Sequence, residues 1–443
     1  MITARLPSSL AIQRLLTRSL VSLARARQEG RGGMPMSRRK PLFFILATIF
    51  IDSIGFGLIM PVLPRLLMKV GGLDLAQAIE LGAWMGLAIA VTTFFGAPIL
   101  GNLSDRFGRR PVLLIALGGL AIDYLLLAIA NTIPLIFLGR LLSGAFGGSY
   151  APAQAAIADT TPPDQRARTF GYVSAAFGVG FVAGPAIGGL LGELGERAPF
   201  YAASALAALN FLYGLTLFPE TLAQDKRRAF DWRRANPLGA VAAARAVSGM
   251  WGAVVVLTLW QTASMVYPMT WSFYVIANFG WSNAMIGASL AAVGVVIALS
   301  QTLLTGPAVQ RFGERDAATI GLIAAITGFI AYAFAQSSWQ AFAIMIAIAV
   351  QSLVQPSLMA MLSRRATPET QGEVQGIASM SMGVGNIVAP LVLTRVMAEF
   401  TGADAPIHFP GAAFLVAALL GLAALVLLRR LPRADQVQQG FDR

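Results

Sequence analysis

One short stretch decides the fold of this chain: Gly101-Asn-Leu-Ser-Asp105-Arg106-Phe-Gly108-Arg109-Arg110-Pro111-Val112. It joins two long apolar runs and places three arginines, one aspartate and two glycines in a short turn. A second copy, Gly306-Pro-Ala-Val-Gln310-Arg311-Phe312-Gly313-Glu314-Arg315, follows 205 residues later. We expect the rest of the chain to be arranged around these two turns.

The composition is that of a membrane protein. Of the 443 residues, 56% are hydrophobic and 12% are charged, whereas soluble domains have about 25% charged residues. A soluble domain this apolar could not cover its surface with polar groups, so lipid is the expected solvent. The chain has no cysteine, and its single histidine, His408, cannot form a metal cluster alone. We therefore expect no disulfide, no thiol chemistry and no metal site.

The apolar runs after Pro41 have the length of membrane-spanning helices, which need about 20 residues each. We expect six spans before a polar, basic cytoplasmic linker at 219–248 and six spans after it. The predicted spans are 42–64, 81–103, 111–131, 134–156, 168–192, 199–218, 250–276, 283–305, 316–335, 339–361, 374–397 and 410–428. The predicted fold is an all-α integral membrane protein of twelve transmembrane helices, with an N-terminal half at 41–218, a C-terminal half at 249–430 and a cytoplasmic tail at 431–443.

Residues 1–40 differ from the rest of the chain, because they contain nine arginines and lysines and one acid, Glu29. The composition resembles a transit peptide, but no apolar run long enough for the core of a cleaved signal peptide precedes Lys40. We interpret the segment as a basic, disordered cytoplasmic arm, or as sequence upstream of a true start at Met34 or Met36.

Positive charge is distributed unevenly between the two sides of the predicted bundle. Arginine and lysine are concentrated in the linker, in the C-terminal tail and in the loops after the second, fourth, eighth and tenth spans. The loops of the opposite side contain four such residues, Arg65, Lys69, Arg197 and Arg395. The positive-inside rule then places both termini in the cytoplasm. The net charge of +12 is thus explained by membrane orientation, and we expect no nucleic-acid partner.

The offset of 205 residues that relates the two turns recurs elsewhere in the chain. Residues 177–185 align with 382–390, and residues 161–171 align with 366–376, at the same offset. Three matches at one offset predict two six-span halves related by an axis along the membrane normal. Secondary transporters have this layout, with the substrate site between the halves near the midplane.

The residues of the first turn suit a latch on the cytoplasmic side. Gly101 would let the second span approach a neighbour, and Gly108 would permit a tight turn. Asp105 can accept a hydrogen bond from Arg109, or from a helix N-terminus across the gap between the halves. The alternative is a solvated basic turn that only follows the positive-inside rule. In the second copy Gln310 stands in the place of Asp105 and Glu314 in the place of Arg109, so we expect a second latch that is weaker or absent.

The turn Gly-x-x-x-Asp-Arg-x-Gly-Arg-Arg resembles the signature of the major facilitator superfamily. Further stretches between about residues 45 and 430 resemble the tetracycline-resistance efflux proteins, which are drug/proton antiporters of that superfamily. These stretches are Ile51-Asp52-Ser-Ile-Gly55-Phe-Gly57-Leu-Ile-Met-Pro61-Val-Leu-Pro64, Ile122-Asp123-Tyr124-Leu-Leu-Leu-Ala128, Leu138-Gly-Arg140-Leu-Leu-Ser-Gly144, Ile157-Ala-Asp159-Thr-Thr161 and Phe279-Gly280-Trp281.

This resemblance implies roles for particular residues. It implies that Asp52, Asp123 and Arg140 belong to the substrate and proton pathway. It implies a cytoplasmic gate formed by Gly101, Asp105, Arg106, Gly108, Arg109 and Asp159. It also implies that the fifth span carries the antiporter motif of drug exporters, in which close glycines let helices touch and a proline kinks the span. The residues of that motif are Gly180, Gly184, Pro185 and Gly188.

The resemblance further implies an exporter of the inner (plasma) membrane. Its expected cargo is a tetracycline-like or other amphipathic drug, exchanged for protons by alternating access. We expect no cofactor beyond the proton gradient, although a divalent cation could accompany a tetracycline-like substrate. The expected partners are the substrate, protons and the lipid bilayer, with a monomer as the functional unit.

The physical chemistry of the membrane agrees in part with these roles. A charge at the centre of a membrane helix costs roughly 2.5–3.5 kcal/mol even on a lenient scale. Asp52, Asp123 and Arg140 lie inside predicted spans, so we expect them to face a cavity or a partner. The alternative is a purely structural aspartate–arginine pair inside the N-terminal half.

The C-terminal half departs from the pattern of the family. Its spans contain no central charged residue or histidine. The family has a histidine in the eighth span and an acid in the ninth, where this chain has Ile297 and Ala325. Either proton coupling runs through the charged residues of the N-terminal half, or the protein is uncoupled or differently coupled.

Amide side chains are the polar groups that the C-terminal half offers to a substrate. We expect Gln261, Gln301 and Gln355 to line an apolar pocket with few polar groups, which suits an amphipathic drug. The alternative is that they bond one helix to another. The functional alternatives are an exporter of an unrelated metabolite or drug, and a membrane sensor that does not transport. No nucleophile–base set or phosphate loop indicates an enzyme.

Overall fold

The computed structural model describes residues 36–232, 251–364 and 371–431. The predicted N-terminal arm up to residue 35, much of the predicted linker and nearly all of the predicted tail lie outside these residues. Within the described residues the chain is helical and contains no strand, as the sequence predicted.

We call the helices from α2 to α9 the N-terminal half. They are α2 (Met36–Ile59), α3 (Leu63–Gly71), α4 (Leu75–Phe107), α5 (Arg109–Ile129), α6 (Ile133–Phe146), η1 (Gly147–Ser149), α7 (Tyr150–Thr160), η2 (Pro163–Gln165), α8 (Arg166–Glu193) and α9 (Ala198–Leu217). The short 3₁₀-helix η3 (Gln224–Lys226) follows in the linker.

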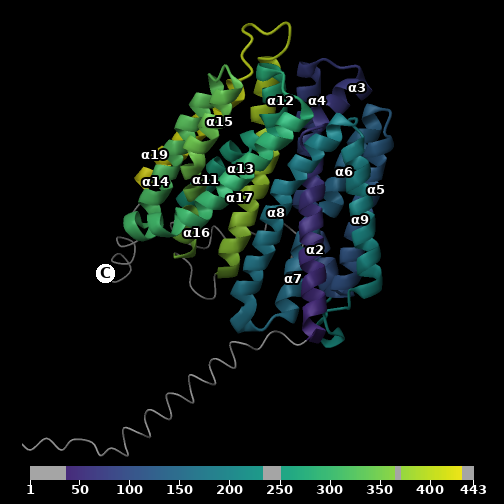
Figure 1. Cartoon of the computed structure of the whole chain (residues 1–443). Coiled ribbons are helices and arrows are strands. Elements are labelled where there is room, and N and C mark those ends of the chain that lie inside the picture. Colours follow the sequence, from purple (N-terminus) through teal and green to yellow (C-terminus); the bar gives the residue numbers. More distant parts are fainter. Residues whose placement is uncertain (1–35, 233–250, 365–370, 432–443) are drawn as a thin grey trace, which may run out of the picture.

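We call the helices from α11 to α19 the C-terminal half. They are α11 (Trp251–Ser264), α12 (Val266–Phe279), α13 (Asn283–Leu303), α14 (Thr305–Ala333), α15 (Ser338–Ala347), η4 (Ile348–Leu353), α16 (Val354–Ser363), α17 (Gln371–Ala389), η5 (Pro390–Thr394), α18 (Arg395–Glu399) and α19 (Ala412–Arg430). Figure 1 shows the two halves beside each other, with the start of α2 and the end of α19 toward the same end of the bundle.

The described residues contain eleven helical segments that are long and apolar enough to cross a membrane. The predicted span at 134–156 is not among them, because the structure divides it into α6, η1 and α7. The break falls at Gly147-Gly148-Ser149, where three residues form a 3₁₀ turn. At Gly148 an added Cβ would lie 2.9 Å from the Ala97 Cα of α4, so only glycine allows this approach.

Two helices are longer than the sequence predicted. Helix α4 begins at Leu75 because Asp74 caps its N-terminus, accepting a hydrogen bond of 2.8 Å from the Gln77 amide. Helix α14 begins at Thr305, so the second Arg-rich turn is a sharp bend between two helical parts and not a separate loop. Gly313 makes this bend with a φ of 76°, which favours glycine.

The offset of 205 residues is visible in the structure. The Arg-rich turns bend at Gly108 and Gly313, and both have positive φ values, of 107° and 76°. Helices α6 and α15 begin at Ile133 and Ser338, which are also 205 residues apart. The first helix of each half is interrupted at equivalent positions, near Met60 and at Met265. The two halves therefore repeat one pattern of helices and breaks.

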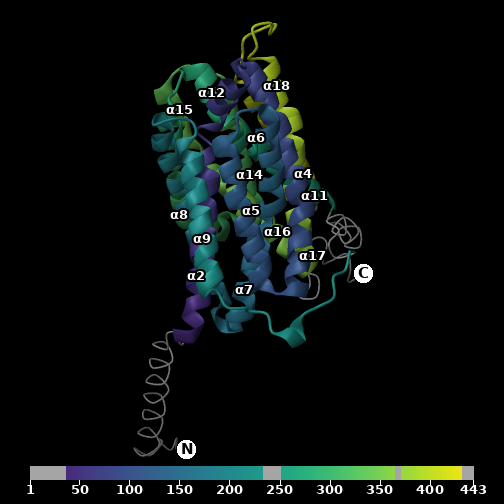
Figure 2. The same ribbon diagram turned by 90° about the vertical axis from the view of Figure 1, so that its right-hand side faces the viewer.

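The two ends of the bundle differ in how the halves meet. We call the end with Gly108 and Gly313 the turn end, and the opposite end, where α4 starts, the far end. The described part of the linker, up to residue 232, runs along the turn end (Figure 2), where the Arg228 amide donates to the Asp105 carbonyl at 3.0 Å. The hydrogen bonds that join the two halves directly gather toward the far end.

Four such hydrogen bonds close the far end. Arg65 donates to the Trp281 carbonyl at 2.8 Å, and Ser272 donates to the Met60 carbonyl at 2.8 Å. The Asn283 amide donates to the Gly192 carbonyl at 3.1 Å, and Glu193 accepts from the Ala284 amide at 2.8 Å. Nearby, within the N-terminal half, a 2.7 Å hydrogen bond from Lys69 holds the pKa of the Glu196 carboxyl below its ordinary value.

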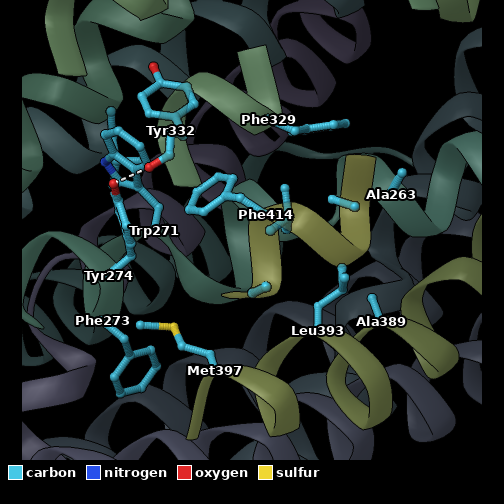
Figure 3. Packing of buried hydrophobic residues seen from close by; sticks show 14 of the residues in the cluster. Ala263, Trp271, Phe273, Tyr274, Phe329, Tyr332, Ala389, Leu393, Met397 and Phe414 are labelled. Atoms are coloured by element: carbon cyan, nitrogen blue, oxygen red, sulfur yellow. Dashed lines mark hydrogen bonds between the residues drawn. The ribbon is translucent and has the colours of Figure 1, made fainter. Parts of the chain in front are cut away.

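Aromatic side chains fill the far part of the C-terminal half. Figure 3 shows Trp271, Tyr274, Tyr332 and Phe414 directed toward one another. The Tyr274 hydroxyl donates to the Tyr332 carbonyl at 2.5 Å, and the rings of Trp271 and Tyr332 meet edge to face at 5.2 Å. Burial of these rings makes this part of the half a packed block.

We predict that the glycines of α8 that face α2 are required for stability. At Gly184 an added Cβ would lie 2.7 Å from the Ile54 carbonyl oxygen, so Gly184→Ala should cost about 1–3 kcal/mol through overpacking. Gly178→Ala on the same helix is the matched control, because no atom lies within 4 Å of its added Cβ. Thermal unfolding in detergent should give a lower melting temperature for Gly184→Ala alone, and equal melting temperatures would contradict the packing.

Candidate functional site

Asp52 lies on α2, half-buried, and meets the break in the divided fourth span. Its Oδ2 accepts a hydrogen bond of 2.8 Å from the Ser149 hydroxyl. Ser149 is buried and ends η1, so the 3₁₀ turn is what brings this hydroxyl to the carboxylate. Ser149 was not predicted as a site residue, and its only signal in the sequence is the preceding pair of glycines.

Asp123 and Arg140 lie together inside the N-terminal half. Arg140 Nη2 is 3.7 Å from Asp123 Oδ2, and both side chains are buried between α5 and α6. The Ser143 hydroxyl also donates to Asp123 Oδ2. Gly139 leaves room for the pair, because an added Cβ would lie 2.9 Å from Asp123 Oδ1. The two residues thus form a buried ion pair inside the N-terminal half, separate from the Asp52 contact.

Arg109 is the centre of the first Arg-rich turn. Its guanidinium donates to Asp105 Oδ1 at 2.5 Å, to Asp159 Oδ2 at 3.0 Å and to the Ser104 hydroxyl at 2.7 Å. The Arg109 side chain is 8% exposed, whereas that of Asp105 is 42% exposed. The structure therefore joins three of the predicted gate residues, Asp105, Arg109 and Asp159, in one cluster with a buried cation.

Two other predicted gate residues do not join this cluster. Arg106 is exposed, and its guanidinium lies 5.0 Å from the ring centre of Phe107. The close helix approach expected at Gly101 is absent, because an added Cβ there would meet no described atom within 4 Å. The reason is that the hydrogen bonds between the halves gather at the far end and leave this part of α4 uncovered.

The linker supplies an acid, Glu220, that was not predicted as a site residue. Glu220 Oε1 accepts from the Arg109 amide at 2.8 Å, and Oε2 accepts from the Arg110 amide at 3.3 Å. These amides begin α5, so the carboxylate neutralises the positive end of that helix. An acid directly after the sixth span is the signal that could have identified it.

The second Arg-rich turn contains an ion pair of reversed polarity. Glu314 accepts from Arg364 Nε at 2.7 Å. Glu314 and Arg364 lie 205 residues after Arg109 and Asp159, so the pair is repeated with its charges exchanged. The second turn therefore has an ion pair of its own, and the weaker or absent second latch stays a prediction.

The three predicted glutamine side chains of the C-terminal half differ in burial. Gln261 is buried beside α17, and Gln355 starts the α16 segment and is half-buried. Gln301 is exposed near the turn end of α13. Ala325, which stands in the place of the family's acid, is fully buried. No hydrogen bond joins the three glutamine side chains in the described part of the chain.

The glycines of α8 form two contact lines. An added Cβ at Gly180 or Gly184 would lie 2.7 Å from a carbonyl oxygen of α2, and Gly188 is packed on Leu58 of α2 even more closely. On the side of α8 that faces α13, a Cβ added at Gly189 would lie 2.5 Å from the Asn283 carbonyl oxygen. Gly287 of α13 packs directly against Pro185 of α8. This part of α8 therefore packs against α2 of its own half and against α13 of the C-terminal half.

Comparisons with known proteins agree with this arrangement. A sequence profile of the Major Facilitator Superfamily matches residues 45–276 and 253–442. The chain is 40% identical over 395 residues to "Tetracycline resistance protein, class C" of Escherichia coli, covering 89% of this chain and 98% of that protein. It is 25% identical to the "Quinolone resistance protein NorA" of Staphylococcus aureus, covering 91% of this chain and 100% of the relative.

A solved structure gives the same result for the fold. The human organic anion transporter MFSD10 is 25% identical, with a TM-score of 0.64, and the match covers 89% of this chain and all of that one. The relatives are transporters, which confirms the prediction that the chain is not an enzyme. They also confirm the predicted resemblance to tetracycline-resistance proteins. The chain belongs to the major facilitator superfamily.

Proposed function

We propose that this protein is a secondary active exporter that moves a tetracycline-like or other amphipathic drug out of the cell in exchange for protons. The observation that carries the proposal is the half-buried carboxylate of Asp52, which has one hydroxyl partner, Ser149, and lies beside the exposed Phe56 on one face of α2. The drug-resistance relatives support the class of cargo.

The packing of α2 explains why this face is open. Tyr124 of α5 lies against Gly55, Asn210 of α9 contacts Thr48, and the α8 glycines cover the side around Ile54. The face that remains contains Asp52 and Phe56, spaced one helical turn apart, with Ser149 of η1 beside Asp52 and Met60 directly after the end of the helix. At the far end of this face, the Met60 carbonyl accepts the hydrogen bond from Ser272 of the C-terminal half. Asp52 therefore faces the space between the halves.

The proposed cycle alternates between contacts at the far end of the bundle and contacts at the turn end. In this structure the halves are hydrogen-bonded at the far end, while the Arg109 cluster is satisfied within its own half and the linker. We assign this arrangement to the inward-facing state, open at the turn end. Closing the turn end would bring the exposed edge of Asp105 toward the C-terminal half as the far-end bonds break.

The remaining features of the proposal follow from the sequence and topology. Counting α6, η1 and α7 as one divided span gives twelve spans in two halves, at 41–218 and 249–430, with the linker at 219–248. The positive-inside rule predicts that both termini lie in the cytoplasm. The likeness to tetracycline-resistance proteins of bacteria supports the inner membrane as the location. The functional unit is a monomer driven by the proton gradient, and a divalent cation could enter with a tetracycline-like cargo.

Proton handling is assigned to Asp52 and not to Asp123. Asp123 is enclosed with Arg140 and Ser143, whereas Asp52 faces the substrate path and has one hydroxyl partner among the described residues. A second candidate is an exporter of unrelated cargo without the usual coupling. It is favoured by Ile297 and Ala325, which leave the C-terminal half without a central titratable group.

We predict that Asp52→Asn abolishes substrate-driven proton movement. The amide keeps the size of the side chain but cannot carry a proton. The measurement is the internal pH of proteoliposomes on addition of tetracycline, with Gly178→Ala as the matched control. Proton flux that survives in Asp52→Asn would refute the assignment, and no flux in the parent protein would favour the uncoupled alternative.

We predict that transport is more sensitive to substitution in the first Arg-rich turn than in the second. Asp105→Asn should abolish transport because it removes an ion-pair partner of Arg109, whereas Gln310→Ala should leave most of it. The measurement is uptake of labelled tetracycline into inverted membrane vesicles. Equal loss in both variants would mean that the turns act symmetrically.

We also predict that the reversed pair can be exchanged without loss. Glu314→Arg and Arg364→Glu should each reduce tetracycline uptake, because each places like charges together. The double variant restores an ion pair in the polarity of the N-terminal half and should recover most of the uptake. A double variant no better than the two single ones would show that the pair does not act as a unit.

A further inference from the structure

Four aromatic side chains form a row beside Asp52 on the N-terminal half. The rings of Phe56 and Phe181 are stacked with centroids 6.5 Å apart, and those of Phe181 and Phe177 are stacked at 6.0 Å. Tyr150 extends the row, 6.2 Å from Phe177. The row crosses α2, α8 and α7, which lie side by side in Figures 1 and 2. We call these four residues the aromatic row.

The ends of the row adjoin the Asp52 contact. Phe56 lies one helical turn after Asp52, on the same open face of α2, and it is 54% exposed. Tyr150 directly follows Ser149, whose hydroxyl binds the Asp52 carboxylate. The carboxylate is therefore the polar end of a surface that is otherwise aromatic.

The middle of the row faces away from lipid. At 3.6 residues per turn, Phe177 and Phe181 lie on α8 between the glycines that touch α2 and those that touch α13. The exposed aliphatic residues Val179 and Leu190 lie about 160–180° around the helix from Phe181. Those aliphatic side chains form the lipid face, so the phenylalanines face the space between the halves.

The C-terminal half has different chemistry at the equivalent positions. The offset of 205 relates Phe56 to Gln261, Tyr150 to Gln355, Phe177 to Met382 and Phe181 to Asn386. Three of the four aromatic residues thus have an amide as counterpart. We call Gln261, Gln355 and Asn386 the amide wall.

The amide wall has hydrogen-bonding capacity that the protein does not use. Gln355 Oε1 and Asn386 Oδ1 are buried and have no hydrogen-bond partner among the described residues. A buried carbonyl oxygen without a partner is costly, so such atoms indicate a missing donor. Gln261 belongs to the same surface, because its Cβ would lie 3.0 Å from a Cβ added at Gly385, next to Asn386.

We propose that the space between the halves is a substrate site with two unlike walls. The aromatic row stacks on the flat face of a fused-ring ligand, and the amide wall binds the donors along its polar edge. Asp52 binds or exchanges a proton at one end. The inference rests on the proposed function and narrows the cargo to planar, fused-ring amphiphiles with a hydrogen-bonding edge.

The two-wall arrangement also explains how a pseudo-symmetric protein binds an asymmetric molecule. Two equivalent walls would accept a ligand in two opposite orientations. Aromatic rings favour a π-face, and amides favour hydrogen-bonding groups, so the unlike walls select one orientation. This fixes which group of the ligand meets Asp52.

The first test measures tetracycline binding to the purified full chain in detergent by equilibrium dialysis. The double variant Phe177→Leu/Phe181→Leu keeps apolar volume but removes the rings, and it should bind roughly two- to tenfold more weakly. Phe177→Tyr/Phe181→Tyr should restore the affinity, because the rings are restored. Phe43→Leu is the matched control, since Phe43 is an exposed phenylalanine of α2 outside the row.

The second test addresses the amide wall. Gln355→Leu and Asn386→Leu should each weaken tetracycline binding by roughly three- to tenfold, through loss of one hydrogen bond. Gln336→Leu, an exposed amide between α14 and α15, should leave the affinity unchanged. Equal melting temperatures with the parent would establish that the weaker binding is not a folding defect.

The outcomes separate this site from the export function. Parent binding that is unchanged in both sets of variants would overturn the two-wall site and leave export in place. Parent binding with the expected sensitivities, but without uptake into inverted vesicles, would overturn export and leave the site in place. A parent protein that does not bind tetracycline would overturn the two-wall site and leave export of another amphipathic drug in place.

Discussion

The contact of α8 with both α2 and α13 is the constraint on which the rest of the structure depends. In a bilayer no hydrophobic effect pulls helices together, so small residues that allow close backbone approach must supply the packing. Gly184 brings α8 against α2, and Gly189 brings the same helix against α13 of the other half. This placement sets the distance between the halves, the face that Phe181 presents and the side of α2 on which Asp52 remains open.

The two halves share one backbone pattern but not one chemistry. At the offset of 205, Asp52 corresponds to Leu257, Asp123 to Gly328 and Arg140 to Met345. The N-terminal half therefore holds the membrane charges, while the C-terminal half fills the same positions with apolar groups. At the turn end, in contrast, both halves keep an ion pair, with Arg109 and Glu314 as equivalent residues of opposite charge.

This division of chemistry fits a transporter that handles a proton and a large amphiphile at once. In the proposed function Asp52 is the one carboxylate that exchanges the proton, without a second titratable group at the equivalent position of the C-terminal half. An amphiphile needs extended contact area, which the aromatic row and the amide wall supply. The ion pairs at the turn end can be charged, because the buried member of each pair, Arg109 or Glu314, is held by a more exposed partner of opposite charge.

Much of this could be predicted from the sequence, because it depends on local patterns and on the repeat. Span positions follow from apolar runs, and the Asp123–Arg140 pair follows from charges that need partners inside a membrane. The contact of Asp105 with Arg109 follows from opposite charges in one turn, and the resemblance to the family added Asp159. The Ser149 contact could not be predicted, since it requires a helix to break within an apolar run. Glu220 and the aromatic row were missed for a related reason. Their role depends on which helix faces which, and that is set by tertiary packing.

The central claim is that the open face of α2 lines the substrate path. The chain contains no cysteine, so a single introduced thiol can be labelled without background. The decisive measurement is labelling of Phe56→Cys by a membrane-impermeant maleimide in inverted vesicles, with and without tetracycline, beside Val179→Cys on the lipid face. We expect Phe56→Cys to be labelled and to be protected by the drug, while Val179→Cys is not labelled. Phe56→Cys that stays unlabelled, or that is labelled equally with and without the drug, would contradict the claim.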